Sequence, residues 1–524
     1  MKNILTIALA VGLACQACYE DKGHYEYLPV NEISVVDFPS TLDASMGDTL
    51  VYMPKFSFAD PGDTTGFDFW WEYKGLYDEL GYHEVICHGR ELRFAPRLIG
   101  SQRVQLCARE TRVGVITTFS MYINGGSAYS KGWLVLREEN NETKLSYIRP
   151  ERSVKGDVTS RRVYSPYPDI REKLFPGEIT GRGPLALRQI LGSGSVGSAF
   201  YIIQQDETAC FNGLSYKKEI LLASEFLGGT PAGLDPRDHF QGGYASLILN
   251  ADKTIYYRGA NPSSFFVNTF ANFPMKRQGE VVHVDRIIPA AAGISYFFAL
   301  IDGENKRFLW VYTGNLVNGG SMLLAPPVAL DGEHLDYNDI SGVEILYSAF
   351  HDEGSSGSDR TARNITLYKR DGKTRVQRCK GTATLYTIMP DAYPLSDFEN
   401  NAFPGEQYID GNTEYYQLKT RAYLFFVTGS NLYWYDHLTR AVHLFYTLPA
   451  GAAVVKMASN PQESELGVAL SNGKFIILGI ENDQLATTAA RLFEIDLPGR
   501  IVDMDYKFPN ESSYTGRTAT SNWD

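Results

Sequence analysis

The stretch GWLVLREENNETKLSYI, residues 132–148, sets the pattern from which the fold of this 524-residue chain is predicted. An apolar run is followed by a short turn rich in Asn and then by a second run of mixed polarity. Two such runs joined by a turn of Asn, Asp or Gly are typical of a β-hairpin. The stretch therefore predicts a hairpin whose first strand is buried.

The same pattern recurs downstream, in the stretches SAFYIIQQDETACFNG, ASLILNADKTIYYRG, SYFFALIDGENKRFLWVYTG, ARNITLYKRDGKTRVQRC, AYLFFVTGSNLYWYDHLTRAVHLFY and LGVALSNGKFIILGIEN. Hairpins repeated along a long chain favour the blades of a β-propeller. Seven units fit between about residues 128 and 508, and six or eight remain open. A second β-sandwich or a β-helix is the structural alternative. The run 491–508 is expected to supply a closing strand, which removes exposed sheet edges.

The residues before this region predict a small immunoglobulin-like β-sandwich of about seven short strands. Strand alternation in FDFWWEY, residues 67–73, places four side chains on the core face: Phe67, Phe69, Trp71 and Tyr73. Trp70 is then the aromatic residue on the opposite, polar face. The sequence predicts an all-β protein with a signal segment at 1–17, a sandwich at 18–126, a propeller at 127–510 and a flexible tail at 511–524.

The N-terminus predicts export and lipidation. Lys2 precedes an apolar run that is too short to span a bilayer, and Cys15 and Cys18 follow it. A signal that ends at a cysteine is typical of bacterial lipoproteins. Cys18 is favoured as the acylated residue, because the acidic pair Glu20-Asp21 would then lie just inside the mature N-terminus. The alternative is an ordinary secreted protein with two incidental cysteines.

The segment CYEDKGHYEYLPVNEISV, residues 18–35, resembles the mature N-terminus of the PKD-like lipoproteins of the Bacteroidota. His24 departs from the asparagine that is usual in that family. The GWLVL segment at the start of the second region also resembles the family. The resemblance implies an outer-membrane lipoprotein, often encoded beside a TonB-dependent transporter and its lid lipoprotein. It implies no reaction.

Composition excludes several partners and sites. The net charge of −12 makes nucleic acid an unfavourable partner. Apart from Cys15 and Cys18, no two cysteines form a CxxC pair, and no HExxH motif is present, so we expect neither a metal nor a cofactor. Cys87 and Cys107 lie on two predicted strands of the sandwich, and either a disulfide or two free thiols fits the sequence. Cys210 and Cys379 are expected to be buried thiols.

Two inserts interrupt the hairpin rhythm. Residues 150–190 are basic, with a helical stretch near Asp169–Leu174, and residues 225–245 are rich in glycine. The second insert holds the most enzyme-like cluster of the chain, formed by Asp235, Asp238 and His239. No GxSxG elbow or phosphate-binding glycine loop accompanies it. An enzyme is therefore less favoured than a binding protein.

Exposed aromatic rings beside polar groups are suited to sugar or peptide recognition. The candidates are Trp70, Tyr164, Tyr167, Tyr415 and Tyr416. Ordinary burial is the competing interpretation for each. We expect a surface-exposed lipoprotein of the outer membrane that binds a glycan, a peptide or a partner protein during nutrient uptake. The alternatives are a carbohydrate-active lyase or hydrolase, and a scaffold that docks on a TonB-dependent transporter.

Overall fold

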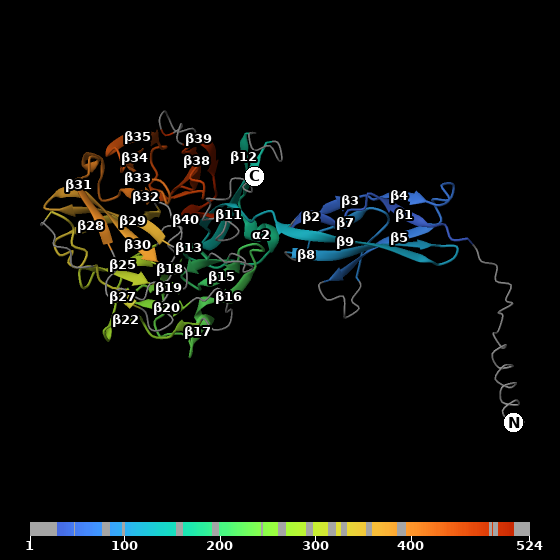
Figure 1. The fold of residues 1–524 in the computed structure, drawn as a ribbon, viewed down its shortest axis with the longest axis horizontal. Coiled ribbons are helices and arrows are strands. Elements are labelled where there is room, and N and C mark those ends of the chain that lie inside the picture. Colours follow the sequence, from blue (N-terminus) through green and yellow to red (C-terminus); the bar gives the residue numbers. More distant parts are fainter. Residues whose placement is uncertain are drawn as a thin grey trace, which may run out of the picture. The chain divides into compact units, whose positions relative to one another are not determined.

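The computed structural model describes residues 29–46, 48–75, 84–96, 100–153, 161–190, 199–242, 245–259, 269–289, 297–312, 321–325, 333–352, 359–384, 395–481, 485 and 491–507. The predictions for the signal segment, Cys18 and the tail lie outside these residues. The chain divides into two compact units, Met1–Gly126 and Ser127–Asp524 (Figure 1). No helix in the described ranges is both long and apolar enough to cross a membrane.

The first unit is a β-sandwich. One layer is a five-stranded sheet in the order β2-β9-β8-β5-β6, and its strands are β2 (Thr41–Met46), β9 (Ile116–Ser127), β8 (Gly100–Glu110), β5 (Phe67–Gly75) and β6 (Glu84–His88). The other layer consists of two strand pairs, β1 (Ile33–Val36) with β4 (Lys55–Phe58) and β3 (Leu50–Tyr52) with β7 (Leu92–Phe94). Side chains from all three sheets form one core.

The core of the sandwich is built on the predicted face of β5. Trp71 is fully buried, and its ring meets that of Tyr52 edge-on at 6.4 Å. Phe69 packs on Phe56 at 4.8 Å between ring centres. The alternation predicted for residues 67–73 is therefore confirmed, because the same four aromatic side chains face the core.

Cys87 and Cys107 do not form the disulfide that the sequence left open. Both thiols are free. Cys87 pairs with Trp71 on one side of β5, whereas Cys107 pairs with Trp70 on its other side. Two strand spacings of about 4.8 Å separate them, which exceeds the Cα distance that a disulfide tolerates. Because Trp70 and Trp71 alternate, the two thiols also lie on opposite faces of the sheet.

The second unit is a β-propeller, and its described residues form seven blade sheets of three or four strands each (Figure 1). Written from inner to outer strand, the first three blades are β40 (Arg500–Lys507), β10 (Gly132–Glu139), β11 (Glu142–Arg152) and β12 (Arg162–Tyr167); β13 (Pro184–Ile190), β14 (Ala199–Gln204), β15 (Ala209–Asn212) and β16 (Lys218–Leu221); and β18 (Pro236–Gly242), β19 (Ala245–Asn250) and β20 (Ile255–Gly259).

The next four blades are β24 (Arg286–Ile288), β25 (Phe297–Asp302), β26 (Arg307–Tyr312) and β27 (Ser321–Leu323); β28 (Glu344–Asp352), β29 (Asp359–Arg370), β30 (Lys373–Thr384) and β31 (Leu395–Ala402); β32 (Glu414–Gln417), β33 (Tyr423–Thr428), β34 (Asn431–Asp436) and β35 (Ala441–Thr447); and β36 (Val454–Ser459), β37 (Glu465–Leu470), β38 (Lys474–Gly479) and β39 (Arg491–Asp496). Two small strand pairs join β17 (Phe226–Leu227) with β21 (Phe270–Ala271) and β22 (Lys276–Arg277) with β23 (Glu280–Val281).

The inner strands form a ring. Strand β40 lies beside β13, β13 beside β18, β24 beside β28, β28 beside β32, β32 beside β36, and β36 beside β40. In Figure 1 the colours run once around this ring, from cyan through green and yellow to red. Apolar side chains between neighbouring sheets fill the interior. The prediction of about seven blades is confirmed.

The C-terminal strand closes the ring, as predicted for the run 491–508. Strand β40 pairs antiparallel with β10, so that Gly132 lies opposite Lys507 and Trp133 opposite Tyr506. The first blade thus combines strands from the two ends of the unit. Trp133 is fully buried and packs against Tyr506 at 5.0 Å and against Phe475 of the last blade at 5.7 Å.

The two predicted inserts are largely blade strands. Residues 162–167 and 184–190 form β12 and β13, and residues 236–242 form β18. The polar composition of β12 and β18 made these strands hard to recognise, since Arg162 and Asp238 contact neighbouring blades through their charged groups. The predicted helical stretch is the short helix α2 (Ile170–Leu174), whose first turn is capped by the side chain of Asp169. Two 3-10 turns, η2 (Leu222–Glu225) and η4 (Glu406–Tyr408), lie in connections between blades.

Closure requires a glycine where the last blade meets the first. A Cβ atom on Gly467 of β37 would lie 2.5 Å from the Trp133 ring. We therefore expect Gly467→Ala to reduce stability by about 1–3 kcal/mol, because overpacking forces the indole to move.

The urea midpoint of unfolding measures this change. The matched control is Gly411→Ala, because a Cβ there meets no atom within 4 Å. That variant is expected to change stability by less than about 1 kcal/mol. Equal midpoints for the two variants would show that Trp133 does not fix the contact between the last and first blades.

Candidate functional site

A chain of ion pairs links four neighbouring inner strands of the propeller. Arg188 of β13 donates from Nε to Asp238 of β18 and from Nη1 to Asp503 of β40, each at 2.5 Å. Lys456 of β36 contacts the other carboxylate oxygen of Asp503 at 2.6 Å. We call these four residues, Arg188, Asp238, Lys456 and Asp503, the axial chain.

The axial chain faces a space that solvent reaches. The side chains of Arg188, Asp238 and Lys456 are 28%, 31% and 33% exposed, although their strands form the innermost layer of the ring. Asp503 is 6% exposed and lies between its two cationic partners. The backbone N–H of Leu187 also donates to Asp503, at 2.9 Å. The carboxylate of Asp503 is thus the centre of the chain.

Mutual neutralisation fixes the charge states of this chain. Burial disfavours the charge on Arg188, but the carboxylates of Asp238 and Asp503 outweigh that penalty and raise its pKa. Burial disfavours the charge on Asp503 as well, yet Lys456 and Arg188 outweigh it and lower the pKa of this carboxyl. General acid–base catalysis needs a group whose pKa lies near the working pH. The central arginine and carboxylate are both shifted away from that range.

The predicted cluster of Asp235, Asp238 and His239 is not one site. Asp235 lies before β18 and pairs with the exposed side chain of Arg237 at 2.6 Å. Asp238 joins the axial chain, whereas His239 is buried and packs against Tyr201 in a tilted arrangement, with 4.6 Å between ring centres. Residues 238 and 239 point to opposite faces because they are consecutive in a strand.

His239 is held neutral. Burial lowers its pKa, and Arg258 and Arg188 lower it further. Within the described part of the chain, neither ring nitrogen has a hydrogen-bond partner. A neutral, enclosed imidazole of this kind fills space between two blades and cannot reach a substrate.

Sequence reasoning missed the polar group that packs beside His239. The Tyr201 hydroxyl donates to Glu225, and Arg258 contacts the same carboxylate at 2.6 Å. Arg258 also lies over the Phe270 ring at 4.5 Å. These residues come from three strands and the 3-10 turn η2, and they lie up to 69 positions apart. No spacing in the sequence therefore marks them as a group.

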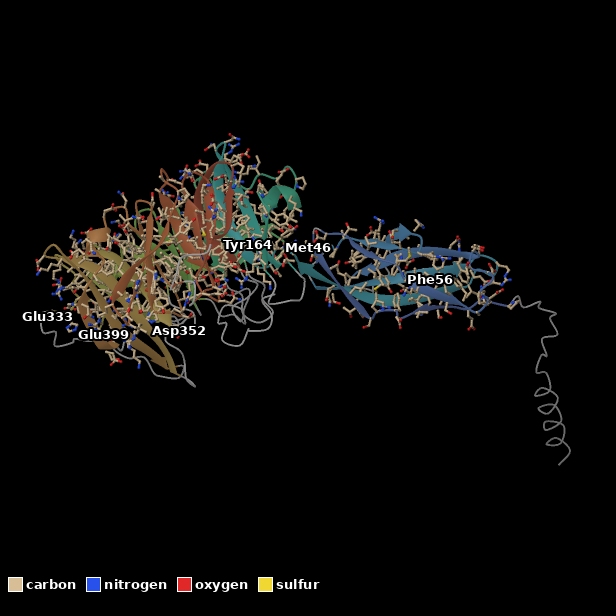
Figure 2. All side chains as sticks on the ribbon, turned by 90° about the horizontal axis from the view of Figure 1, so that it is seen from above. Met46, Phe56, Tyr164, Glu333, Asp352 and Glu399 are labelled. Carbon is tan, nitrogen blue, oxygen red and sulfur yellow. The ribbon has the colours of Figure 1, made fainter. Side chains whose placement is uncertain are left out.

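Tyr164 is part of the seam between the last and first blades and is not a free aromatic platform. Tyr164 is labelled in Figure 2 among the side chains of the propeller. Its hydroxyl donates to Glu465 at 2.8 Å, and Trp133 donates to the same carboxylate at 3.3 Å. Arg162 pairs with Glu465 as well. Because Glu465 is 1% exposed, these donors compensate a buried charge.

The other tyrosine candidates also pack within the propeller. Tyr167 lies 5.2 Å from the Tyr129 ring, and Tyr415 stacks on Tyr347 at 5.5 Å. The Tyr416 hydroxyl is hydrogen-bonded to Ser459 of the next blade. For these three, ordinary packing between or within blades accounts for the aromatic side chain.

Trp70 differs from the tyrosines because it lies on the outward face of the sandwich sheet. It is half-buried, and its indole N–H donates to Glu72 at 2.8 Å. The predicted placement on the polar face is therefore correct. Of the aromatic candidates, Trp70 alone belongs to a sheet face rather than to the interior of the propeller.

A buried histidine pair lies between the fifth and sixth blades. The rings of His351 and His437 are parallel at 6.3 Å, and His437 is hydrogen-bonded to Gln417 at 2.8 Å. Burial lowers the pKa of His351 to about 3, with Arg378 and Arg363 contributing. Among the described residues no three His, Cys, Asp or Glu side chains are placed to hold a metal ion.

Residues 18–167 match the PKD-like family. The match spans the sandwich and continues through β12 of the first propeller blade. No curated protein matches the chain.

Several solved structures resemble the chain at low sequence identity. A quinonprotein alcohol dehydrogenase-like protein from Bacteroides thetaiotaomicron is 11% identical, with 91% of this chain and 98% of that chain covered and a TM-score of 0.42. The dihydro-heme d1 dehydrogenase NirN is 10% identical, with coverages of 75% and 77% and a TM-score of 0.38. AztD from Citrobacter koseri is 11% identical, with coverages of 84% and 97% and a TM-score of 0.35. Similarity at this level carries no statement about function.

The axial chain leads to a prediction about pH. Asp503→Asn leaves Arg188 and Lys456 without their shared carboxylate, and breaking a buried ion pair from one side costs about 3 kcal/mol. The pKa of Asp503 is lowered in the folded state. Its contribution to the free energy of unfolding is therefore complete above its unfolded pKa of about 4, and this contribution is lost as the pH falls below that value.

The free energy of unfolding should therefore differ between the wild type and Asp503→Asn at pH 7, and this difference should shrink below about pH 4. Asp68→Asn is the control, because the Asp68–Arg109 pair is about half exposed on both sides. We expect it to cost less than about 1 kcal/mol. A pH-independent difference for Asp503→Asn would contradict the assigned charge.

Proposed function

We propose that this protein is a lipid-anchored, non-catalytic binding component of a nutrient-uptake system on the outer-membrane surface. The observation that carries the proposal is the self-neutralised axial chain. Arg188 forms ion pairs with both Asp238 and Asp503. The residues that suggested an enzyme, Asp235, Asp238 and His239, lie in three different environments. A rigid ring with loops from every blade then offers surfaces for recognition rather than groups for proton transfer.

The anchor rests on the sequence around Cys18. A short apolar run, residues 4–13, precedes this residue, and the PKD-like match begins at Cys18. The resemblance of residues 18–35 to lipoproteins of the Bacteroidota supports an outer-membrane location and a place beside a TonB-dependent transporter. Stable anchoring requires more than one acyl chain, which a lipoprotein cysteine provides.

Lipidation can be tested with two cysteine variants. Cys18→Ala is expected to move the protein from the membrane fraction to the soluble fraction and to abolish labelling by a clickable fatty acid. Cys15→Ala is the matched control and should keep both properties. A Cys18→Ala variant that stays labelled in the membrane would contradict this assignment.

Binding without turnover is the second expected property. The full-length protein, purified in mild detergent, should bind a polysaccharide or peptide saturably while the ligand keeps its size in chromatography. Shortened chains would instead identify a carbohydrate-active enzyme. Co-purification with a TonB-dependent transporter, without affinity for any ligand, would identify a scaffold.

A further inference from the structure

The outward face of the sandwich sheet carries two aromatic rings on opposite sides of a polar strip. Alternation along β5, β8 and β9 turns one set of side chains away from the core. We call this set the Trp70 face, and its residues are Trp70, Glu72, Arg103, Gln105, Ser120 and Tyr122. Tyr122 is 49% exposed, which is unusual for a large ring on a sheet.

The register fixes how far apart the two rings are. Trp70 pairs with Cys107, Cys107 pairs with Thr118, and Tyr122 lies four residues further along β9. Two strand spacings and four residues of rise place the two Cα atoms about 15–17 Å apart. A ligand that covers both rings is therefore an extended chain and not a single small molecule.

Hydrogen-bonding side chains fill the space between the rings. Glu72, Gln105 and Ser120 lie in one row across the three strands. Glu72 accepts from the Trp70 indole at 2.8 Å, and the Arg103 guanidinium donates to Ser120 at 3.2 Å. Carboxylate, amide, hydroxyl and guanidinium groups together supply both donors and acceptors, which hydroxyl groups require.

The charges of this surface are balanced. Glu72 is paired with Lys74 at 3.0 Å, and the neighbouring Asp68 is paired with Arg109 at 2.6 Å. The chain as a whole carries −12. A polyanion would therefore gain little from this face and would be repelled at long range. The core of a protein–protein interface is depleted in charged residues, whereas here the centre is polar.

We propose that the Trp70 face binds a neutral polysaccharide, with Trp70 and Tyr122 each stacking on a sugar ring of one extended chain. The apolar face of a sugar packs against an aromatic ring, and its hydroxyl groups meet the polar strip. This inference rests on the proposed binding function. It adds a ligand class and places the binding site on the sandwich.

Affinity electrophoresis of the full-length protein in gels that contain a soluble polysaccharide tests this inference. The probes are yeast mannan, pullulan, galactomannan and hydroxyethyl cellulose, with polygalacturonate as the anionic comparison. We expect at least one neutral probe to slow migration. Trp70→Ala should weaken that binding at least about tenfold, as expected for loss of a central aromatic contact.

Three further variants separate binding from stability. Tyr122→Ala should weaken binding several-fold, and Trp70→Phe should keep most of it, since the ring remains and only the N–H to Glu72 is lost. Tyr408→Ala is the matched control, because this tyrosine is 38% exposed but belongs to the propeller. It should bind as the wild type does. Thermal midpoints show which variants fold, and Tyr122→Ala carries the test if Trp70→Ala does not.

The remaining outcomes overturn the inference in distinguishable ways. Neutral-glycan binding that survives Trp70→Ala and Tyr122→Ala would place the site elsewhere and leave the proposed function intact. Binding of polygalacturonate alone, or of a peptide or protein alone, would refute the ligand class but not the function. Cleavage of a probe would refute the non-catalytic function itself.

Discussion

The pairing of β40 with β10 is the constraint on which the propeller depends. It joins the last strand of the unit to the first strand, so that the first blade becomes a four-stranded sheet whose inner strand lies beside the inner strand of the last blade. Trp133 on β10 extends this joint into the last blade, where Gly467 makes room for its ring. Glu465 of the last blade then accepts hydrogen bonds from Trp133 and Tyr164 of the first blade across the same seam.

The same strand organises the centre of the ring. Asp503 of β40 receives Arg188 from one side and Lys456 from the other, and Arg188 continues to Asp238. A carboxylate placed on the closing strand thus connects four blades through charge as well as through packing. Each of these four charged side chains has a partner of opposite charge, so the charges of the axial chain compensate one another.

The fold could be predicted from the sequence wherever the pattern is local. Buried strands followed by turns of Asn, Asp and Gly marked most blades, and alternation in residues 67–73 correctly assigned Trp71 to the core and Trp70 to the opposite face. Strand β18 was missed, since its segment PRDHFQG has no apolar period. Its charged residue makes contacts between blades, and such contacts have no local signature.

The residues of the candidate site could likewise be predicted only where the sequence pattern is local. Asp238 was named from the sequence, but its partner Arg188 lies 50 positions away from it. Asp503 lies 315 positions from Arg188, so nothing in the spacing indicates that these residues interact. Tyr164, Tyr415 and Tyr416 looked like exposed rings because burial between blades depends on which sheets become neighbours. Trp70 was placed correctly because one strand suffices to determine its face.

The position of β40 at the far end of the unit has a consequence for biogenesis. A polypeptide is synthesised from its N-terminus, so β10 is made long before its partner, which lies more than 360 residues later. Until β40 is made, the edge of β10 that later pairs with it exposes unpaired amide and carbonyl groups to neighbouring chains. A product that lacks the last 25 residues has no β40 and would keep this edge of β10 unpaired.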